Sequence, residues 1–384
     1  MKLHIVIPWF GERSGGAEIY AHGLARALTQ AGHAVEVLTT CCRDPFSDWS
    51  ASQLPAGESQ VDGLTVRRFP PDPRDAALYA RLELKARNGC ALTDAEERAW
   101  IRNSINSDTL TEFIGRNRAS GHFIFLPYLY GVTFFGLRAA GGRGWLVPCL
   151  HNESAAYFRI FDEMFTRARG AMFLSQPEMD FARIRYGLPF EKCKLIRGGI
   201  ETQPGDAERF RRAHGIEKDY LLYLGRLVPG KGADVLVNCY RRGLECGDAL
   251  PDLVLIGEGE AMDSCGGRVR TLGYLPDQDV RDAMSGCLAL CQPSFYESFS
   301  IVLLENWLHG RPAIVNAHCD VTREHCRASG GGLWFADSSE FRACVSWLRE
   351  DASRASALGQ AGKRYVEQNF IWPRTTHAVE EFIL

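Results

Sequence analysis

The stretch LALCQPSFYESFSIVLLENWLHGRPAIVN, residues 288–316, passes from an apolar run through a polar loop into a helical pattern and then a second apolar run. Ser298 or Ser300 is expected to cap a helix whose buried first turns are residues 301–308. Strand-like runs that alternate with helical patterns are typical of parallel sheets covered by helices on both faces. The stretch therefore predicts an α/β fold.

The same alternation runs through both halves of the chain. In the first half, strands are expected at LHIVIP, AVEVLTT, LTVRRF, GHFIFL, WLVPCL and AMFLS, and in the second half at YLLYLGRL, LVLIGEG, VRTLGYL, LALCQPS and PAIVN. A chain of 384 residues is also longer than a single hydrophobic core usually supports. Two such series predict two Rossmann-like domains that face a cleft.

Glycine and proline mark the expected boundaries. The stretch KLIRGGIETQPGD, residues 194–206, breaks any regular element, so we place one domain at residues 1–197 and the other at 198–372. Pro373 interrupts a helical pattern, and we expect residues 373–384 to form a helix that crosses back to the first domain. Residues 74–120 read as a helical excursion, in which TDAE starts a helix after a turn at 87–93. Acceptor recognition and a simple lid are equally good uses for that excursion.

Bulk composition excludes several classes of function. A formal net charge of -3 gives no general case for nucleic acid. The start, MKLHIVIPWF, reads as a first strand and not as a signal peptide, so the 13 cysteines are expected to be reduced thiols in the cytosol. Residues 123–137 are apolar but too short to span a membrane, although a surface contact fits them. Residues 318–326, HCDVTREHC, are expected to be a loop rim and not a metal site.

Polar and glycine residues follow several of the predicted strands. Gly15 and Gly16 separate the first strand from an Ala/Leu-rich helix and let backbone approach a ligand, without the spacing of a dinucleotide loop. Arg226 ends a strand and Lys231 precedes a helix, which suits a pyrophosphate clamp as well as a solvated loop with two unrelated cations. His151 lies just beyond a strand, where a functional and a structural histidine are equally expected.

Two carboxylates bracket the loop that enters the helix of residues 301–308. Glu297 lies before the helix and Glu305 lies inside it, so the two do not form an intrahelical pair. The backbone N–H groups of Phe299, Ser300 and Ile301 are expected at the positive end of the helix, where an anion is favoured. A ligand with both hydroxyl and phosphate groups suits this stretch.

Together these features resemble the retaining GT-B glycosyltransferases of family four. The resemblance covers nearly the whole chain, and its specific part is the pair of glutamates combined with the Arg and Lys loop. The positions that carry it are Gly15-Gly16, His151, Gly198-Gly199-Ile200, Gly225-Arg226, Lys231-Gly232, Gly257-Glu258-Gly259, Gly273, Glu297 and Glu305.

The resemblance implies a nucleotide diphosphate sugar held mainly by the C-terminal donor domain, with the N-terminal domain on the acceptor side. Arg226 and Lys231 would bind the diphosphate, Glu305 the ribose hydroxyls and Glu297 the transferred sugar, with His151 near that sugar. The N–H groups of residues 299–301 would hold sugar or phosphate oxygens, and Gly16 would let the N-terminal loop close over the diphosphate.

The implied activity is retaining transfer of a hexose-type sugar, without a metal or cofactor, to a glycan or lipid-linked acceptor in surface polysaccharide or glycoconjugate assembly. A cytoplasmic protein is expected, with peripheral contact at the inner face of the membrane as an option. A degenerate sugar-nucleotide-binding partner subunit and a GT-B phosphorylase or epimerase stay as alternatives. An NAD-dependent dehydrogenase is disfavoured by the failed glycine patterns. The chain departs from the family at Ser298 and Ser300, where glycines are common.

Overall fold

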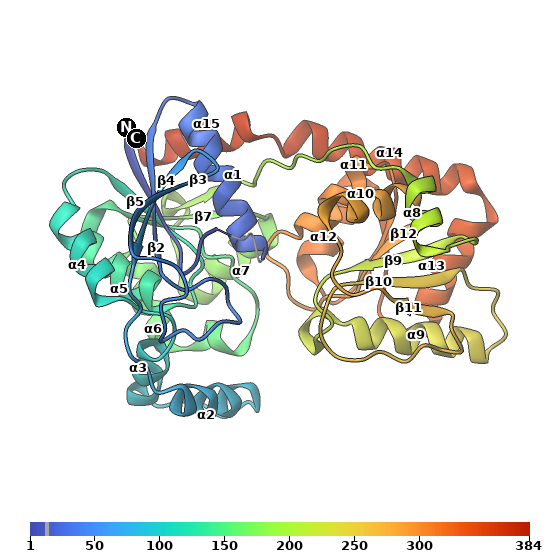
Figure 1. Ribbon diagram of the computed structural model, residues 1–384, viewed down its shortest axis with the longest axis horizontal. Coiled ribbons are helices and arrows are strands. Elements are labelled where there is room, and N and C mark those ends of the chain that lie inside the picture. Colours follow the sequence, from blue (N-terminus) through green and yellow to red (C-terminus); the bar gives the residue numbers. More distant parts are fainter. Residues whose placement is uncertain (12–14) are drawn as a thin grey trace. The chain divides into compact units, whose positions relative to one another are not determined.

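The computed structural model describes residues 1–11 and 15–384. Residue contacts divide the chain into two compact units. Unit 1 comprises Met1–Gly199 and Trp372–Leu384, and unit 2 comprises Ile200–Ile371. Each unit has a largely parallel sheet with helices packed against it (Figure 1). The predicted α/β fold class with two parallel-sheet domains is confirmed. No helix in the described ranges combines the length and the apolar character that crossing a membrane requires.

Unit 1 is built on an eight-stranded sheet in the order β3-β4-β2-β1-β5-β6-β7-β8, counted over its described residues. Strand β1, inside the sheet, pairs in parallel with β2 and with β5, so that Ile5 lies opposite Val37 on one side and opposite Ile124 on the other. Its apolar side chains are fully buried, as expected for a strand covered on both faces. The strands are β1 Lys2–Val6, β2 Ala34–Thr40, β3 Gly57–Val61, β4 Leu64–Phe69, β5 His122–Phe125, β6 Gly144–Leu146, β7 Gly170–Phe173 and β8 Cys193–Leu195.

One edge of the unit 1 sheet departs from the expected parallel arrangement. Strand β3 runs antiparallel to β4. The two strands are joined by Asp62 and Gly63, which have positive φ angles of 49° and 78°. Two consecutive residues of this kind form the turn that a tight hairpin prefers, and Asp-Gly is a characteristic sequence for it. The sequence therefore contained the hairpin signal, although β3 itself is too polar to look like a strand.

The helices of unit 1 include the predicted excursion as a run of short helices between β4 and β5. Thr93 caps α3 with a complete capping box, because its side chain accepts from the Glu96 N–H while Glu96 accepts from the Thr93 N–H. The helices are α1 Gly16–Gln30, α2 Ala76–Arg87, α3 Asp94–Arg102, α4 Asp108–Asn117, α5 Gly131–Ala140, α6 Arg159–Arg167, α7 Gln176–Tyr186 and α15 Trp372–Ile383.

The C-terminal helix α15 packs on unit 1 beside α1 (Figure 1). The Trp372 ring fills the space left by two glycines, since a Cβ on Gly23 would lie 2.0 Å from that ring and a Cβ on Gly199 2.3 Å from it. Farther along the helix, the Phe382 ring contacts the Trp145 ring edge to face at 5.1 Å. The return of the chain end to the first unit is therefore fixed by side-chain packing.

Unit 2 is built on a six-stranded parallel sheet in the order β11-β10-β9-β12-β13-β14. Each strand predicted from the sequence overlaps an observed one, whereas β3, β8 and β14 were not predicted. The strands are β9 Tyr220–Leu224, β10 Asp252–Ile256, β11 Val269–Thr271, β12 Ala289–Gln292, β13 Ala313–Asn316 and β14 Gly332–Phe335. The helices are α8 Ala207–His214, α9 Ala233–Glu245, α10 Asp277–Gly286, α11 Ile301–Leu308, α12 Asp320–Ser329, α13 Ser338–Glu350 and α14 Ala352–Asn369.

The expected loop rim at residues 318–326 is also wrong, because most of it lies in α12. Val321, His325 and Cys326 are buried, at 5%, 4% and 1% exposure, and they recur at the spacing of one helix face. The two histidines and two cysteines concealed this apolar face from the sequence pattern.

Candidate functional site

In unit 2, tightly packed glycines position the loop that carries Arg226. Gly225, Gly257 and Gly259 have φ angles of 147°, 141° and 144°, which other residues rarely adopt. A Cβ on Gly257 would lie 2.0 Å from the Gly225 carbonyl oxygen, and a Cβ on Gly259 2.3 Å from that of Leu227. The Gly-Glu-Gly sequence after β10, which fails as a dinucleotide pattern, is therefore needed for two loops to pack backbone against backbone.

Lys231 and Glu297 form the central ion pair of this region. The Lys231 Nζ atom lies 2.6 Å from Glu297 Oε1, and the two side chains are 29% and 10% exposed. The pair joins the loops after β9 and β12, which are neighbouring strands. Gln292, at the end of β12, donates from Nε2 to Glu297 Oε1 at 3.3 Å and to Ser300 Oγ at 3.4 Å. Partners on two sides thus fix the carboxylate before any ligand binds.

Ser300 precedes α11 in the N-cap position, but its side chain does not cap the helix. Its backbone is left-handed, with φ 62° and ψ 66°. Over the described residues, the backbone N–H groups of Ser300 and Ile301 have no hydrogen-bond acceptor. The expected side-chain cap is wrong, because Ser300 Oγ accepts from Gln292 instead. The Phe299 ring is 4% exposed and packs against Phe370 at 5.8 Å.

Glu305 lies on α11, and its side chain forms no hydrogen bond or ion pair with a residue that the structure describes. Burial raises its pKa to about 7, the charge of Asp277 adds to that rise, and Arg281 opposes it. A carboxyl with this pKa changes its charge close to neutral pH. The structure does not bring Glu305 into contact with the Lys231–Glu297 pair, so the two glutamates stand as separate groups.

In unit 1, His151 follows β6 and is half-buried. Its Nδ1 atom lies 3.5 Å from Glu153 Oε1, and the same oxygen accepts from the Tyr128 hydroxyl at 2.9 Å. Burial would raise the pKa of Glu153, but its hydrogen bonds with His151 and Tyr128 hold it below the usual range. Cys149, two residues before the histidine, has a positive φ of 51°. The loop therefore presents His151 from a constrained backbone.

Glu178, on α7, anchors the loop that carries His151, and it was not among the residues predicted from the sequence. Its two carboxylate oxygens accept from the Leu150 N–H and the Leu174 N–H, each at 2.7 Å. Burial raises the pKa of Glu178 to about 7, although these backbone N–H groups act against the rise. Ser175 and Glu178 have the spacing of a capping box, and that spacing was the signal available in the sequence. The glutamate instead ties together the loops after β6 and β7.

Gly15 and Gly16 are placed at the start of α1. The Gly15 backbone is extended, with φ -177°, and a Cβ added there would meet no atom within 4 Å. The described part of unit 1 therefore does not itself require glycine at position 15. The three residues before it, 12–14, lie outside the described ranges.

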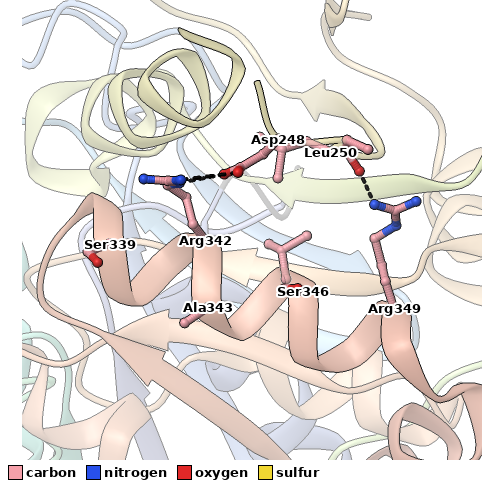
Figure 2. Close-up of a pocket in the computed structure, with 9 residues that line it drawn as sticks. Asp248, Leu250, Ser339, Arg342, Ala343, Ser346 and Arg349 are labelled. Carbon is pink, nitrogen blue, oxygen red and sulfur yellow. Dashed lines mark hydrogen bonds and ion pairs between the residues drawn. The ribbon is translucent and has the colours of Figure 1, made fainter. Parts of the chain in front are cut away.

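A hollow of about 460 Å³ in unit 2 holds none of these residues (Figure 2). Its walls come from α13 and from residues 248–250, and Figure 2 shows Arg342 and Arg349 extending across it. Arg342 pairs with Asp248, and Arg349 donates to the Ala249 carbonyl oxygen. These two arginines are therefore engaged by the chain itself. Across the described residues, no group of three or more His, Cys, Asp or Glu side chains is arranged to hold a metal ion.

Comparison with known proteins gives the class. Residues 218–351, which include Arg226, Lys231, Glu297 and Glu305, match the family model described as glycosyl transferases group 1. A D-inositol 3-phosphate glycosyltransferase from Kribbella flavida is 25% identical over 94% of this chain and 88% of its own length. The protein is a glycosyltransferase.

Solved structures extend the match to the whole fold. Sucrose-phosphate synthase from Thermosynechococcus elongatus superposes with a TM-score of 0.71 and 16% identity, over 99% of this chain and 97% of that one. Anabaena HepE in complex with UDP and glucose gives a TM-score of 0.71 and 17% identity, over 99% and 98%. The chain has the GT-B fold, as its sequence resemblance predicted, and its residues 218–351 are similar to the group 1 glycosyltransferases.

Proposed function

We propose that this protein is a retaining hexosyltransferase that uses a nucleotide diphosphate sugar without a metal ion. The observation that carries the proposal is the Lys231–Glu297 pair at 2.6 Å, held by Gln292 beside the unbonded N–H groups at the start of α11. A diphosphate needs cationic and N–H donors, and a sugar needs carboxylate acceptors. Unit 2 supplies both kinds of group within one pair of neighbouring loops.

Arg226 and Lys231 are assigned to the leaving diphosphate. An ammonium group has three N–H donors, and Glu297 accepts one of them in the structure. The others are left for phosphate oxygens, and Glu297 is assigned to a hydroxyl of the transferred sugar. Two cations that are fixed before the reaction stabilise the negative charge that develops as the sugar departs. This electrostatic role is why no metal ion is proposed.

Glu305 is assigned to the ribose hydroxyls, and the N–H groups of Phe299, Ser300 and Ile301 to sugar or phosphate oxygens. The absence of a hydrogen-bond partner for Glu305 among the described residues supports its role, since a half-buried carboxyl without a donor has unused acceptor capacity. Gly15 and Gly16 are assigned to the approach of unit 1 backbone to the diphosphate. The open space at Gly15 supports this assignment, because the described part of unit 1 gives no other reason for glycine there.

Retention is proposed to follow from attack on the same face of the sugar from which the diphosphate leaves. His151 is assigned to the sugar, held by the Glu178-anchored loop of unit 1. The acceptor is a glycan or a lipid-linked glycan, in surface polysaccharide or glycoconjugate assembly at the cytoplasmic side of a membrane. The Kribbella flavida relative, named for an inositol phosphate substrate, and HepE, whose structure contains UDP and glucose, support a uridine nucleotide and a phosphorylated acceptor as first choices.

The first test is calorimetric titration of the whole protein with UDP, GDP, ADP and dTDP in the presence of EDTA. Binding of one nucleotide in the micromolar range is expected and would name the base. The matching nucleotide sugars are then tested as donors, and the anomeric configuration of the product is read by NMR. Failure of every nucleotide to bind would overturn the proposal, and nucleotide binding without transfer from any matching nucleotide sugar would favour a degenerate partner subunit. Turnover that requires inorganic phosphate would identify a phosphorylase.

A further inference from the structure

A cluster of aromatic rings lies where four adjacent strands of the unit 1 sheet end. Trp9 follows β1, Trp49 follows β2 and Tyr130 follows β5, whereas Tyr79 lies on α2 after β4. Trp49 contacts Tyr130 at 6.0 Å and Tyr79 at 5.5 Å, and Trp9 contacts Tyr130 at 5.2 Å. The carboxyl edge of an open parallel sheet is where such folds bind ligands. We call these four rings the aromatic cluster.

Arg74 projects its guanidinium over this cluster. The Cζ atom lies 4.6 Å from the centre of the Trp49 ring and 4.8 Å from that of the Tyr79 ring. None of its N–H groups donates to a described residue, and no carboxylate among those residues lies within ion-pair distance. Its Nε atom is buried, and desolvation lowers the pKa of the guanidinium. The charge of Asp48 acts on Arg74 without forming an ion pair.

The backbone on both sides of Arg74 is fixed. Pro70, Pro71 and Pro73 restrict the chain between β4 and α2. The Asp72 carboxylate accepts from Asn106 Nδ2 at 2.6 Å and from the Asp108 N–H at 3.0 Å. After Arg74, the Asp75 N–H donates to Asn103 Oδ1 at 2.6 Å. The Arg74 guanidinium is therefore carried by an anchored segment. The hydrogen bonds of Asp72 and Asp75 fix the backbone but do not involve the N–H groups of the guanidinium.

Trp9 gives a second, independent sign of a missing acceptor. It is 5% exposed, and its Nε1 atom is buried with no hydrogen-bond partner. Buried indole N–H groups usually have a partner. By contrast, Trp49 Nε1 in the same cluster donates to the Pro45 carbonyl oxygen at 3.1 Å. Arg74 and the aromatic cluster thus contribute two donor groups, the guanidinium and the Trp9 N–H, for which the described chain provides no acceptor.

We propose that the aromatic cluster and Arg74 bind an acceptor that carries an anionic group, whose phosphate or carboxylate oxygens accept hydrogen bonds from the Arg74 guanidinium. Arginine presents a planar set of donors that matches these two groups, and aromatic faces beside it suit an apolar sugar face. This inference rests on the proposed transferase function and adds the chemical class of its acceptor. A phosphorylated sugar and a uronic acid supply the same chemistry.

The test is calorimetry on the full chain, first saturated with the nucleoside diphosphate that binds most tightly, so that anions do not enter the donor site. The titrants are glucose, glucose 6-phosphate, glucuronate and inorganic phosphate. At least one anionic sugar should bind about tenfold or more tightly than glucose, and Arg74→Met should abolish that preference. Preference for glucose 6-phosphate would indicate a phosphate acceptor, and preference for glucuronate a carboxylate.

Two variants control for indirect effects. Arg183→Met removes the guanidinium that lies 5.2 Å from the Phe190 ring, elsewhere in unit 1, and should leave the anion preference intact. Arg74→Lys keeps the charge but loses the planar fork, so part of the preference should survive. An unchanged urea unfolding midpoint followed by a probe in unit 1 shows that each variant is folded, and unchanged nucleoside diphosphate affinity shows that unit 2 is intact. If the nucleotide binds but no anion is preferred over glucose, or the preference survives Arg74→Met, this inference is wrong while the proposed function stands. If no nucleotide binds, the proposed function fails first.

Discussion

Lys231 in unit 2 and Arg74 in unit 1 are both cations that follow strands of parallel sheets, but their surroundings differ. Lys231 already has a carboxylate partner, Glu297, at 2.6 Å. Arg74 lies over the faces of two rings and has no acceptor among the described residues. A ligand in unit 2 therefore joins an existing ion pair, whereas a ligand in unit 1 supplies the first acceptor.

The difference shows two ways of keeping a cation in position. In unit 2 an opposite charge and a buried amide fix the geometry, so little reorganisation is needed when charge develops. In unit 1 the anchored backbone and the ring contacts fix the arginine, and no described residue accepts from its guanidinium. The first arrangement suits chemistry on one defined group, and the second suits selection among substrates. The following predictions test this contrast, beginning with the largest effect.

Lys231→Ala should lower kcat by about 10²- to 10³-fold, because it removes a preorganised donor from the leaving diphosphate. The measurement is steady-state turnover with the nucleotide sugar identified by calorimetry. Lys363→Ala is the matched control, since Lys363 in the same unit is 40% exposed and lies 4.0 Å from Glu367. That control should keep wild-type turnover. Wild-type turnover in Lys231→Ala would remove the catalytic role assigned to the pair.

Glu178→Gln should destabilise unit 1 at pH 5 by about 2 kcal/mol, because a glutamine amide cannot accept from both the Leu150 and the Leu174 N–H groups. The defect should shrink as the pH rises. With a folded pKa of about 7 against about 4.5 unfolded, the folded wild type binds the extra proton, so Glu178 stabilises less as pH increases through this window. The difference between the two proteins should change by about 2.5 kcal/mol between pH 5 and 8, so that the defect is no longer measurable at pH 8.

The measurement is urea unfolding at several pH values, followed by a probe in unit 1. Glu96→Gln is the control, because Glu96 also sits at the third position of a helix but glutamine can replace glutamate in a capping box. The pKa of Glu96, lowered to about 2 by its hydrogen bond from Lys85, lies below the range tested. Equal pH dependence in both variants would show that Glu178 is not the group that titrates.

The sequence predicted the features that depend on local order along the chain. The α/β fold followed from alternating patterns. Lys231 was singled out with Arg226 as a pair of cations after a strand, and Glu297 with Glu305 as the two carboxylates that bracket a loop. Their contact joins positions 66 residues apart, yet β9 and β12 are neighbours in the sheet, so strand order alone brings the loops together.

The features that the sequence did not reveal depend on tertiary packing. Gln292 and Glu178 look like ordinary residues at the end of a strand and the start of a helix, and their importance lies in which distant groups they meet. The glycines after β10 seemed to fail a nucleotide pattern because the reason for them is the close approach of another loop. In the sequence Arg74 is only the first residue of the charged segment 74–120, because nothing in the local pattern shows that the Trp49 and Tyr79 rings lie beside it.

Glu305→Gln should make nucleotide affinity in unit 2 less dependent on pH. If the Glu305 carboxylate accepts from the ribose hydroxyls, protonation below its pKa of about 7 weakens binding of the wild type. Affinity should therefore rise up to about tenfold from pH 6 to pH 7.5 in the wild type, beyond any rise in the variant. Calorimetry with the same nucleotide on both proteins cancels the ionisation of the phosphates. Parallel pH profiles would contradict the assignment of Glu305 to the ribose.

Ser300→Gly should have the smallest effect, a gain of about 0.5 kcal/mol in stability. Ser300 has a left-handed backbone, which costs a non-glycine residue roughly 1–2 kcal/mol, while glycine loses about 0.5–1 kcal/mol through greater freedom in the unfolded chain. Ser298→Gly is the matched control, since Ser298 is not among the residues with positive φ and should lose stability instead. Urea unfolding followed in unit 2 distinguishes the two signs. Both positions commonly hold glycine in the family that this sequence resembles. If Ser300→Gly gains stability and Ser298→Gly loses it, the backbone favours glycine at 300 but not at 298. Equal losses would mean that the left-handed turn carries no strain, and that the fixed geometry around Glu297 depends on Gln292 and Lys231 alone.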